Sequence, residues 1–164
     1  MIVRSASAFS LRRFDSFQPG DVVKPPRGSF GIVVSVGANN PHRVLWLDTL
    51  TTSELEPDAP LFELHAANEL FVQFNENQQS QAINATPGSI SLAPGVAAFA
   101  VRFPVQQGLL EERLLQLGTW TVVPIAVMTN IARDVHSFFD WSLGTLDRNG
   151  EFVPLKNFQT RAPR

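Results

Sequence analysis

Apolar and polar residues alternate over short stretches between Phe17 and Phe62, and turn-forming residues separate these stretches. A two-residue period is typical of β-strands, whose side chains point alternately to opposite faces. We therefore predict short strands at residues 22–24, 31–36 and 43–48, divided by turns rich in Gly, Pro and Asn.

The third of these strands is apolar on both faces. Val44 and Trp46 share one face, and Leu45 and Leu47 share the other. A strand of this kind is covered on two sides. We expect the interior of a barrel on one side and, on the other, either the second half of the chain or a neighbouring chain.

The same stretch resembles the SH3-like or Tudor-like small β-barrels. The residues that carry the resemblance are an aromatic, a Gly-Asp with a valine pair, a Gly-led second strand, a third strand with a central aromatic and a closing Glu-Leu, here Phe17, Gly20–Val23, Gly31–Val34, Val44–Trp46 and Glu54-Leu55. They cover less than a third of the chain. The resemblance implies a small barrel at residues 14–64.

The resemblance also implies a binding face made of loop aromatics, for which this sequence offers Phe30 and Trp46. Two rings do not make the aromatic cluster that a methyl-lysine cage requires. We therefore expect neither histone-tail nor Pro-peptide recognition to carry over. An SH3-like adaptor that binds a peptide or nucleic acid through its barrel loops is the alternative function.

The rest of the chain also has mostly strand character. We predict strands at residues 69–74, 96–105, 119–130 and 135–146, and a type I′ hairpin turn at Asn149-Gly150. Residues 109–117 are the one predicted helix, because Leu110, Leu114 and Leu117 have helical spacing and Gly118 can end a helix. The polar run 75–89 is long for a connection within a compact domain, so it is predicted to be a loop or linker.

The predicted fold class is therefore mainly β: an SH3-like small barrel followed by a second antiparallel β module with one short helix. The predicted divisions are an N-terminal basic arm at 1–13, the barrel at 14–64, a strand plus polar linker at 65–95, the second module with its terminal hairpin at 96–155 and a basic C-terminal tail at 156–164.

Composition excludes several classes of function. The chain has no cysteine, which removes thiolate catalysis, zinc-thiolate sites and iron-sulfur clusters. A net charge of -2 creates no general positive field for phosphates, so nucleic-acid binding is not expected from bulk charge. No apolar run approaches the roughly 20 residues of a membrane-spanning helix, so we expect no membrane association.

The best candidate for chemistry is the set Asp134, His136 and Asp140. On a strand, His136 and Asp140 share a face but lie about 13 Å apart, too far to hold one ion unaided. No Gly-x-Ser-x-Gly motif and no phosphate-binding glycine loop is present. We therefore predict no catalytic site, no metal and no cofactor, and expect that the protein is not an enzyme.

The basic residues favour assembly. Arginine, which suits partly buried ion pairs at interfaces, outnumbers lysine 11 to 2. The acid-free arm at 1–13 superficially resembles an organelle transit peptide, but we favour a structured arm that docks on a partner or on the rest of the fold. The partner-binding residues that we predict are Phe9, Arg12, Arg13, Phe14, Phe30 and Trp46.

A small barrel, a polar linker, a second β layer and basic arms together resemble the small structural proteins of tailed bacteriophage particles. The resemblance implies a non-enzymatic virion component, such as a capsid cement protein, a tail-completion protein or a head-tail connector (neck) protein. It implies homo-oligomers that bind other virion or shell proteins, and a location in the virion after assembly in the host cytoplasm. A cytoplasmic adaptor is the alternative.

Overall fold

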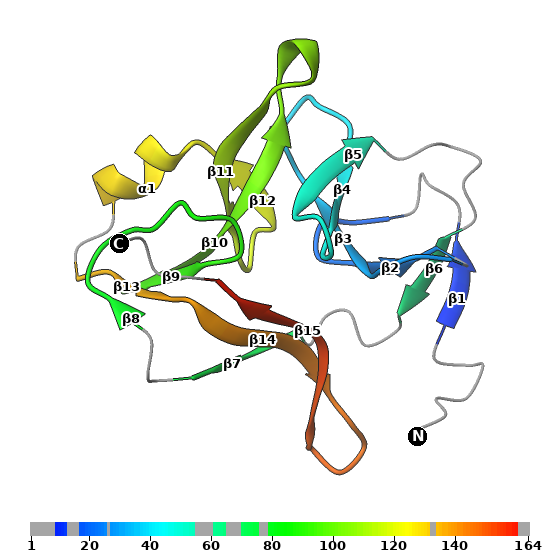
Figure 1. Ribbon diagram of the computed structural model, residues 1–164. Helices are drawn as coiled ribbons and strands as arrows, with labels where there is room; N and C mark the ends of the chain where they lie inside the picture. Colours follow the sequence, from blue (N-terminus) through cyan, green and yellow to red (C-terminus); the bar gives the residue numbers. More distant parts are fainter. Residues whose placement is uncertain are drawn as a thin grey trace.

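The computed structural model of the chain describes residues 9–12, 17–25, 27–54, 61–64, 70–75, 79–131 and 134–160. Within these residues the protein is mainly β with one short α-helix, which confirms the predicted fold class at this level. The strands form one sheet of 12 and one of 3 (Figure 1). The elements are β1 (Phe9–Arg12), β2 (Val22–Lys24), β3 (Gly31–Val34), β4 (Arg43–Trp46), β5 (Thr51–Glu54), β6 (Leu61–Leu64), β7 (Phe71–Phe74), β8 (Gln79–Ser80), β9 (Ile90–Ala93), β10 (Val96–Pro104), the 3₁₀ helix η3 (Gln106–Gly108), β11 (Leu110–Gln116), β12 (Thr121–Val123), α1 (Ile125–Ile131), β13 (His136–Phe138), β14 (Asp140–Leu146) and β15 (Phe152–Gln159).

The first half of the chain forms an antiparallel meander. β2 pairs with β3, β3 with β4 and β4 with β5, and β6 returns to pair with β2 on its other side. The three strands predicted in this stretch are confirmed, although the second and third end earlier than predicted. The first residue of β3, Gly31, has no room for a side chain, because a β-carbon there would meet Val44 and lie 2.9 Å from a ring carbon of Trp46 on β4.

β4 is covered on both faces, as its sequence predicts. Leu45 and Leu47 belong to the main core of the molecule, in which residues of the second half also lie. Val44 and Trp46 pack in a smaller cluster with Phe17, Val23 and Val33. One of the two expected covers is therefore the second half of the chain.

Two backbone connections join the halves. Thr51 of β5 pairs in parallel with Arg102 of β10. Ser35, which follows β3, donates its N–H to Trp120 O at 2.9 Å and accepts the N–H of Val122 at 2.8 Å. The predicted barrel and the predicted second module thus contribute strands to one continuous sheet.

The main core draws on both halves. Trp141 is almost fully buried there, stacked on Phe158 with ring centroids 4.3 Å apart and edge-on to Phe99 at 5.5 Å. Its Nε1 donates to Gly88 O at 2.7 Å. The buried members of this core are Val22, Ile32, Val34, Leu45, Leu47, Ile90, Phe99, Val101, Leu115, Val122, Trp141, Leu143 and Phe158.

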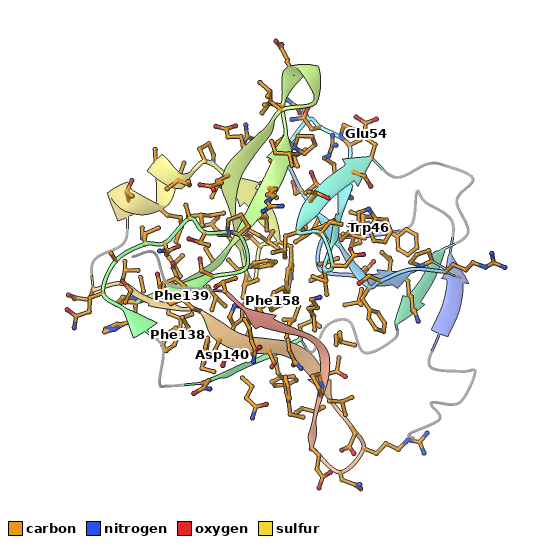
Figure 2. All side chains as sticks on the ribbon, in the orientation of Figure 1. Trp46, Glu54, Phe138, Phe139, Asp140 and Phe158 are labelled. Atoms are coloured by element: carbon orange, nitrogen blue, oxygen red, sulfur yellow. The ribbon has the colours of Figure 1, made fainter. Side chains whose placement is uncertain are left out.

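The chain passes from the large sheet to the small one at Phe139. The single strand predicted at 135–146 is in fact two, because β13 pairs with β8 and β9, whereas β14 pairs with β7 and β15. Figure 2 shows Phe138, Phe139 and Asp140 at this crossing point. Ser137 and Phe139 are buried, as are Trp141 and Leu143 farther along.

The helix predicted at residues 109–117 is wrong. Leu110–Gln116 form β11, which pairs with β10 along its whole length. Leu114 and Leu115 are both fully buried, in two different clusters on opposite faces of the strand. The leucines fit a helical spacing, but packing on both faces and pairing with β10 override that local preference.

The helix forms instead at Ile125–Ile131, within the stretch 119–130 that was predicted as strand. Only Thr121–Val123 of that stretch is a strand. Pro124 lies between the two elements. Its missing N–H interrupts a strand ladder but costs nothing at a helix start, where that donor has no intrahelical partner. Met128 of α1 packs against β10 and β11.

The hairpin predicted at Asn149-Gly150 is confirmed, but its turn type differs. Gly150 has a φ of +79°, whereas Asn149 is not among the described residues with positive φ, so this is not a type I′ turn. Gly150 N–H donates to Asp147 O at 3.1 Å, which makes a type I turn followed by a left-handed glycine. The Asp147 carboxylate accepts the N–H groups of Asn149 and Glu151 and favours this form.

Two predicted loop or tail segments are more ordered than expected. β15 continues to Gln159, within the predicted tail at 156–164, and its Phe158 is buried. In the predicted linker at 75–89, the described part contains the short strand β8 and a loop that ends on the fully buried Ser89. The polar residues of this loop bond to its own backbone, as in Ser89 Oγ to Thr86 O at 2.7 Å.

Candidate functional site

Phe30 and Trp46, two of the predicted partner-binding residues, lie on different faces of the meander. Phe30 is half-buried against the main core, with Lys24 Nζ 5.2 Å from its ring centroid. Trp46 is half-buried against the smaller cluster, and its Nε1 donates to Ser53 Oγ at 2.8 Å. The two rings therefore do not form one shared binding face.

The four predicted residues of the N-terminal region are only partly within the described residues. Phe9 and Arg12 are the two ends of β1, which pairs antiparallel with β6 from Phe9↔Leu64 to Arg12↔Leu61. Residues 9–12 of the predicted arm thus form a strand, and the docking arm at 1–13 stays a prediction. Arg13 and Phe14 lie outside the described residues, and the partner-binding role of all four stays a prediction.

The candidate metal set is spread over an exposed turn and two strands. Asp134 and His136 are exposed, and Asp140 is half-buried with its carboxylate accepting Asn75 Nδ2 at 3.1 Å. Asp134 has a left-handed φ of +55°. Among the residues that the structure describes, no three His, Asp or Glu side chains are placed to share a metal ion.

Two arginines from different halves of the chain meet at one ring. Arg43 Cζ lies 5.3 Å and Arg113 Cζ 4.4 Å from the ring centroid of Phe103 on β10. Arg43 pairs with Glu54 at 3.3 Å, and Arg113 pairs with Glu111 at 2.9 Å. Both guanidinium groups thus have a carboxylate partner, so this cluster joins the halves rather than offering free positive charge.

The β10–β11 hairpin carries the most exposed large apolar side chains among the described residues. Leu109 and Leu110 are 65% and 52% exposed, and Val105 is exposed beside them. The tip of this hairpin extends away from the body of the molecule at the top of Figure 1. We call residues 104–110 the hairpin tip. The sequence signal for it is the pair Pro104 and Gly108, which the predicted helix at 109–117 overlooks.

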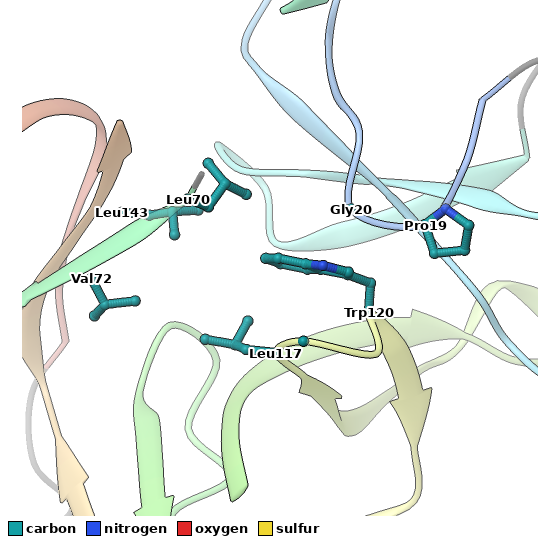
Figure 3. Close-up of a pocket in the computed structure, with 8 residues that line it drawn as sticks. Pro19, Gly20, Leu70, Val72, Leu117, Trp120 and Leu143 are labelled. Atoms are coloured by element: carbon teal, nitrogen blue, oxygen red, sulfur yellow. The ribbon is translucent and has the colours of Figure 1, made fainter. Parts of the chain in front are cut away.

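A pocket of about 460 Å³ lies between the two halves of the chain. Figure 3 shows the indole of Trp120 at its centre, with Pro19 on one side and Leu70, Val72 and Leu143 on the other. The turn from β11 to β12 contributes the remaining wall. The described lining residues are Pro19, Gly20, Leu70, Val72, Leu117, Gly118, Trp120 and Leu143, all apolar or glycine. We call this the Trp120 pocket.

Trp120 adopts a backbone conformation that is rare for its residue type. Its φ is +55°, a left-handed value that costs a residue other than glycine about 1–3 kcal/mol. The hydrogen bond from Ser35 N to Trp120 O helps to hold it there. Strained residues of this kind cluster at binding sites, which makes the pocket a candidate site. No local sequence pattern predicts this pocket, because its walls come from distant segments.

The helical segments of the described residues are all too short or too polar to traverse a lipid bilayer. None of the protein-family models, curated proteins or solved structures with which the chain was compared matches it. What the chain does must therefore be inferred from its own residues.

Proposed function

We propose that this chain is a non-enzymatic assembly protein that binds neighbouring subunits, in the manner of the cement, neck or head-tail connector proteins of tailed bacteriophage particles. The hairpin tip carries the proposal. It presents Val105, Leu109 and Leu110 to solvent on a hairpin whose base is fixed in the core through Phe99 and Leu115.

Apolar side chains at a projecting tip favour docking. Full burial of a leucine contributes about 1.5–3 kcal/mol, so covering the exposed part of Leu109 or Leu110 contributes roughly 0.8–2 kcal/mol for each. The rigid β10–β11 pairing lowers the entropy that is lost on binding. The tip thus has the properties of an anchor that fills a recess in another subunit.

The shared core weighs against the alternative of an independent SH3-like adaptor. One face of the meander, with Ile32, Leu45 and Leu47, packs against Phe99 and Trp141 of the second half. A separate adaptor module would be expected to bury this face by itself. The N-terminal β1, at the edge of the large sheet, offers an assembly protein a second attachment point.

The test is sedimentation velocity of the full chain and of the double variant Leu109→Ser/Leu110→Ser. We expect the wild-type chain to form oligomers and the variant to remain monomeric, with an unchanged urea-unfolding midpoint because both side chains are exposed. The control is Asn149→Ser at the tip of the β14–β15 hairpin, which should assemble as the wild type does. Equal assembly of wild type and double variant would overturn the proposal.

The genes that flank this one test whether the protein is part of a phage particle. Neighbouring genes for capsid, portal or tail proteins support a virion component. A position among genes of metabolic enzymes contradicts it.

A further inference from the structure

β7 is an edge strand of the three-stranded sheet. The strand order in this sheet is β15, β14, β7, so β14 pairs with one side of β7 and no described strand pairs with the other side. Figure 1 shows β7 along the margin of this sheet, below β14. An open strand edge presents N–H and C=O groups with which another chain can pair.

The main-chain groups of Val72 and Phe74 point to this open side. Asn75 N–H donates to Asp140 O at 3.0 Å, so the main-chain groups of Asn75 face β14. In an antiparallel strand these groups face one side and then the other from residue to residue, so those of Phe74 and Val72 point away from β14. Among the described residues, neither has a backbone hydrogen-bond partner on that side.

β7 lacks the features that usually prevent pairing at an edge. Its residues, Phe71–Phe74, include no proline and no charged side chain, and its pairing with β14 contains no bulge. The strand at the opposite edge of the same sheet, β15, carries Pro154 and Lys156. Proline and lysine on an edge strand discourage pairing with another chain. The small sheet thus has one protected edge and one open edge.

The sequence of β7 is complementary to itself in an antiparallel pair. When two copies pair about Gln73, Val72 of each copy lies opposite Phe74 of the other, and their outward N–H and C=O groups make hydrogen bonds. Val72 and Phe74 are half-buried on the core side of the strand, whereas Phe71 and Gln73 are exposed on the other side. Apolar side chains therefore meet apolar ones, the two Gln73 amides can bond to each other, and no like charges meet within the strand.

Resting on the proposed assembly function, we propose that β7 of one copy pairs antiparallel with β7 of a second copy and joins their two small sheets into one. A ladder of four residues is short, so this pair is weak by itself and adds to the contact that the hairpin tip makes. Loss of the tip's leucines is therefore still expected to leave monomers.

A cysteine at position 73 tests the pair directly, because the chain has no native cysteine. In the proposed pair the two Gln73 residues face each other at a non-hydrogen-bonded position, where Cα atoms lie about 4.5 Å apart, within the range of a disulfide. We expect full-length Gln73→Cys to form a disulfide-linked dimer in a glutathione redox buffer, at a concentration at which the wild type assembles. Gln159→Cys, which replaces an exposed glutamine on the protected strand β15, is the matched control and should form far less of the linked dimer.

Charges at the same position test the pair without a covalent bond. Gln73→Glu and Gln73→Lys each place like charges opposite one another, so each variant alone should need an about two- to fivefold higher concentration to assemble at low salt, measured by sedimentation velocity. An equimolar mixture of the two variants should assemble as readily as the wild type. Because Gln73 is exposed, the urea-unfolding midpoints should stay unchanged.

The β7 pair is overturned by equal disulfide formation in Gln73→Cys and Gln159→Cys, by wild-type assembly of both charged variants, or by a mixture that does not recover. In each of these cases, oligomers of the wild-type chain would leave the assembly function standing without this contact. A wild-type chain that remains monomeric at every concentration overturns both.

Discussion

The indole of Trp120 lies directly against the α-carbon of Gly20: a β-carbon built on Gly20 would be 2.6 Å from Trp120 Nε1 and 2.7 Å from its Cδ1. Gly20 belongs to the turn before β2, and Trp120 to the turn before β12. This contact presses one turn of each half together at the pocket. It ties the shape of the pocket to the packing of the two halves.

Replacing Gly20 by alanine should therefore be costly. The added methyl group meets the indole, and Gly20 has a φ of +98°, which disfavours any side chain. We expect the free energy of unfolding to fall by about 2–4 kcal/mol, measured by urea denaturation. Gly95→Ala is the matched control, because Gly95 also has a positive φ but no atom within 4 Å of a β-carbon. A similar loss in both variants would refute the contact.

The indole N–H groups of Trp141 and Trp46 should contribute differently to the free energy of unfolding. Trp141→Phe leaves the buried Gly88 carbonyl without its donor, so we expect a loss of about 1–3 kcal/mol beyond the change in packing. Trp46→Phe frees the hydroxyl of Ser53, which is able to bond to water, so its loss should stay near 1 kcal/mol. Denaturation followed by far-UV circular dichroism compares the two. A larger loss of stability for Trp46→Phe than for Trp141→Phe would show that the core is not centred on Trp141.

The buried hydroxyl pair of Ser91 and Ser137 should behave as one unit. The two Oγ atoms are 2.6 Å apart across β9 and β13, and Ser137 Oγ also donates to Ala82 O. Each single alanine variant should lose about 1–3 kcal/mol, and the double variant should lose less than the sum. A double-mutant cycle measures this coupling. If the loss in the double variant equals the sum of the two single losses, the two hydroxyl groups are not hydrogen-bonded to each other.

A fragment of residues 14–64 should not fold alone. Removing the second half exposes the apolar face with Ile32, Val34, Leu45 and Leu47. We expect a poorly dispersed ¹H–¹⁵N NMR spectrum and no cooperative unfolding transition. A dispersed spectrum together with micromolar binding of a peptide or nucleic acid would instead favour the SH3-like adaptor.

The sequence predicted strands well where turn residues and alternation agree. Gly31, the residues around Asn149-Gly150 and the two-faced β4 all carried local signals that the structure bears out. It failed where local spacing and tertiary packing conflict. The leucines of β11 fit a helix in isolation, but burial of Leu114 and Leu115 on opposite faces is possible only in a strand.

The candidate site could not be predicted from local sequence patterns. Pro19, Val72, Trp120 and Leu143 come from four segments that only the pairing of the two halves brings together. The exposure of Leu109 depends on the β10–β11 hairpin, and the helix predicted at 109–117 is incompatible with that hairpin. Side-chain exposure and contacts between halves are long-range properties, and residue spacing does not encode them.

The most direct test of the assembly account is the mass of the unmodified full-length chain in solution, followed by light scattering across the micromolar range. The proposed assembly function predicts a mass that rises from that of the monomer to that of an oligomer as the concentration increases. A single monomeric species at every concentration would contradict it.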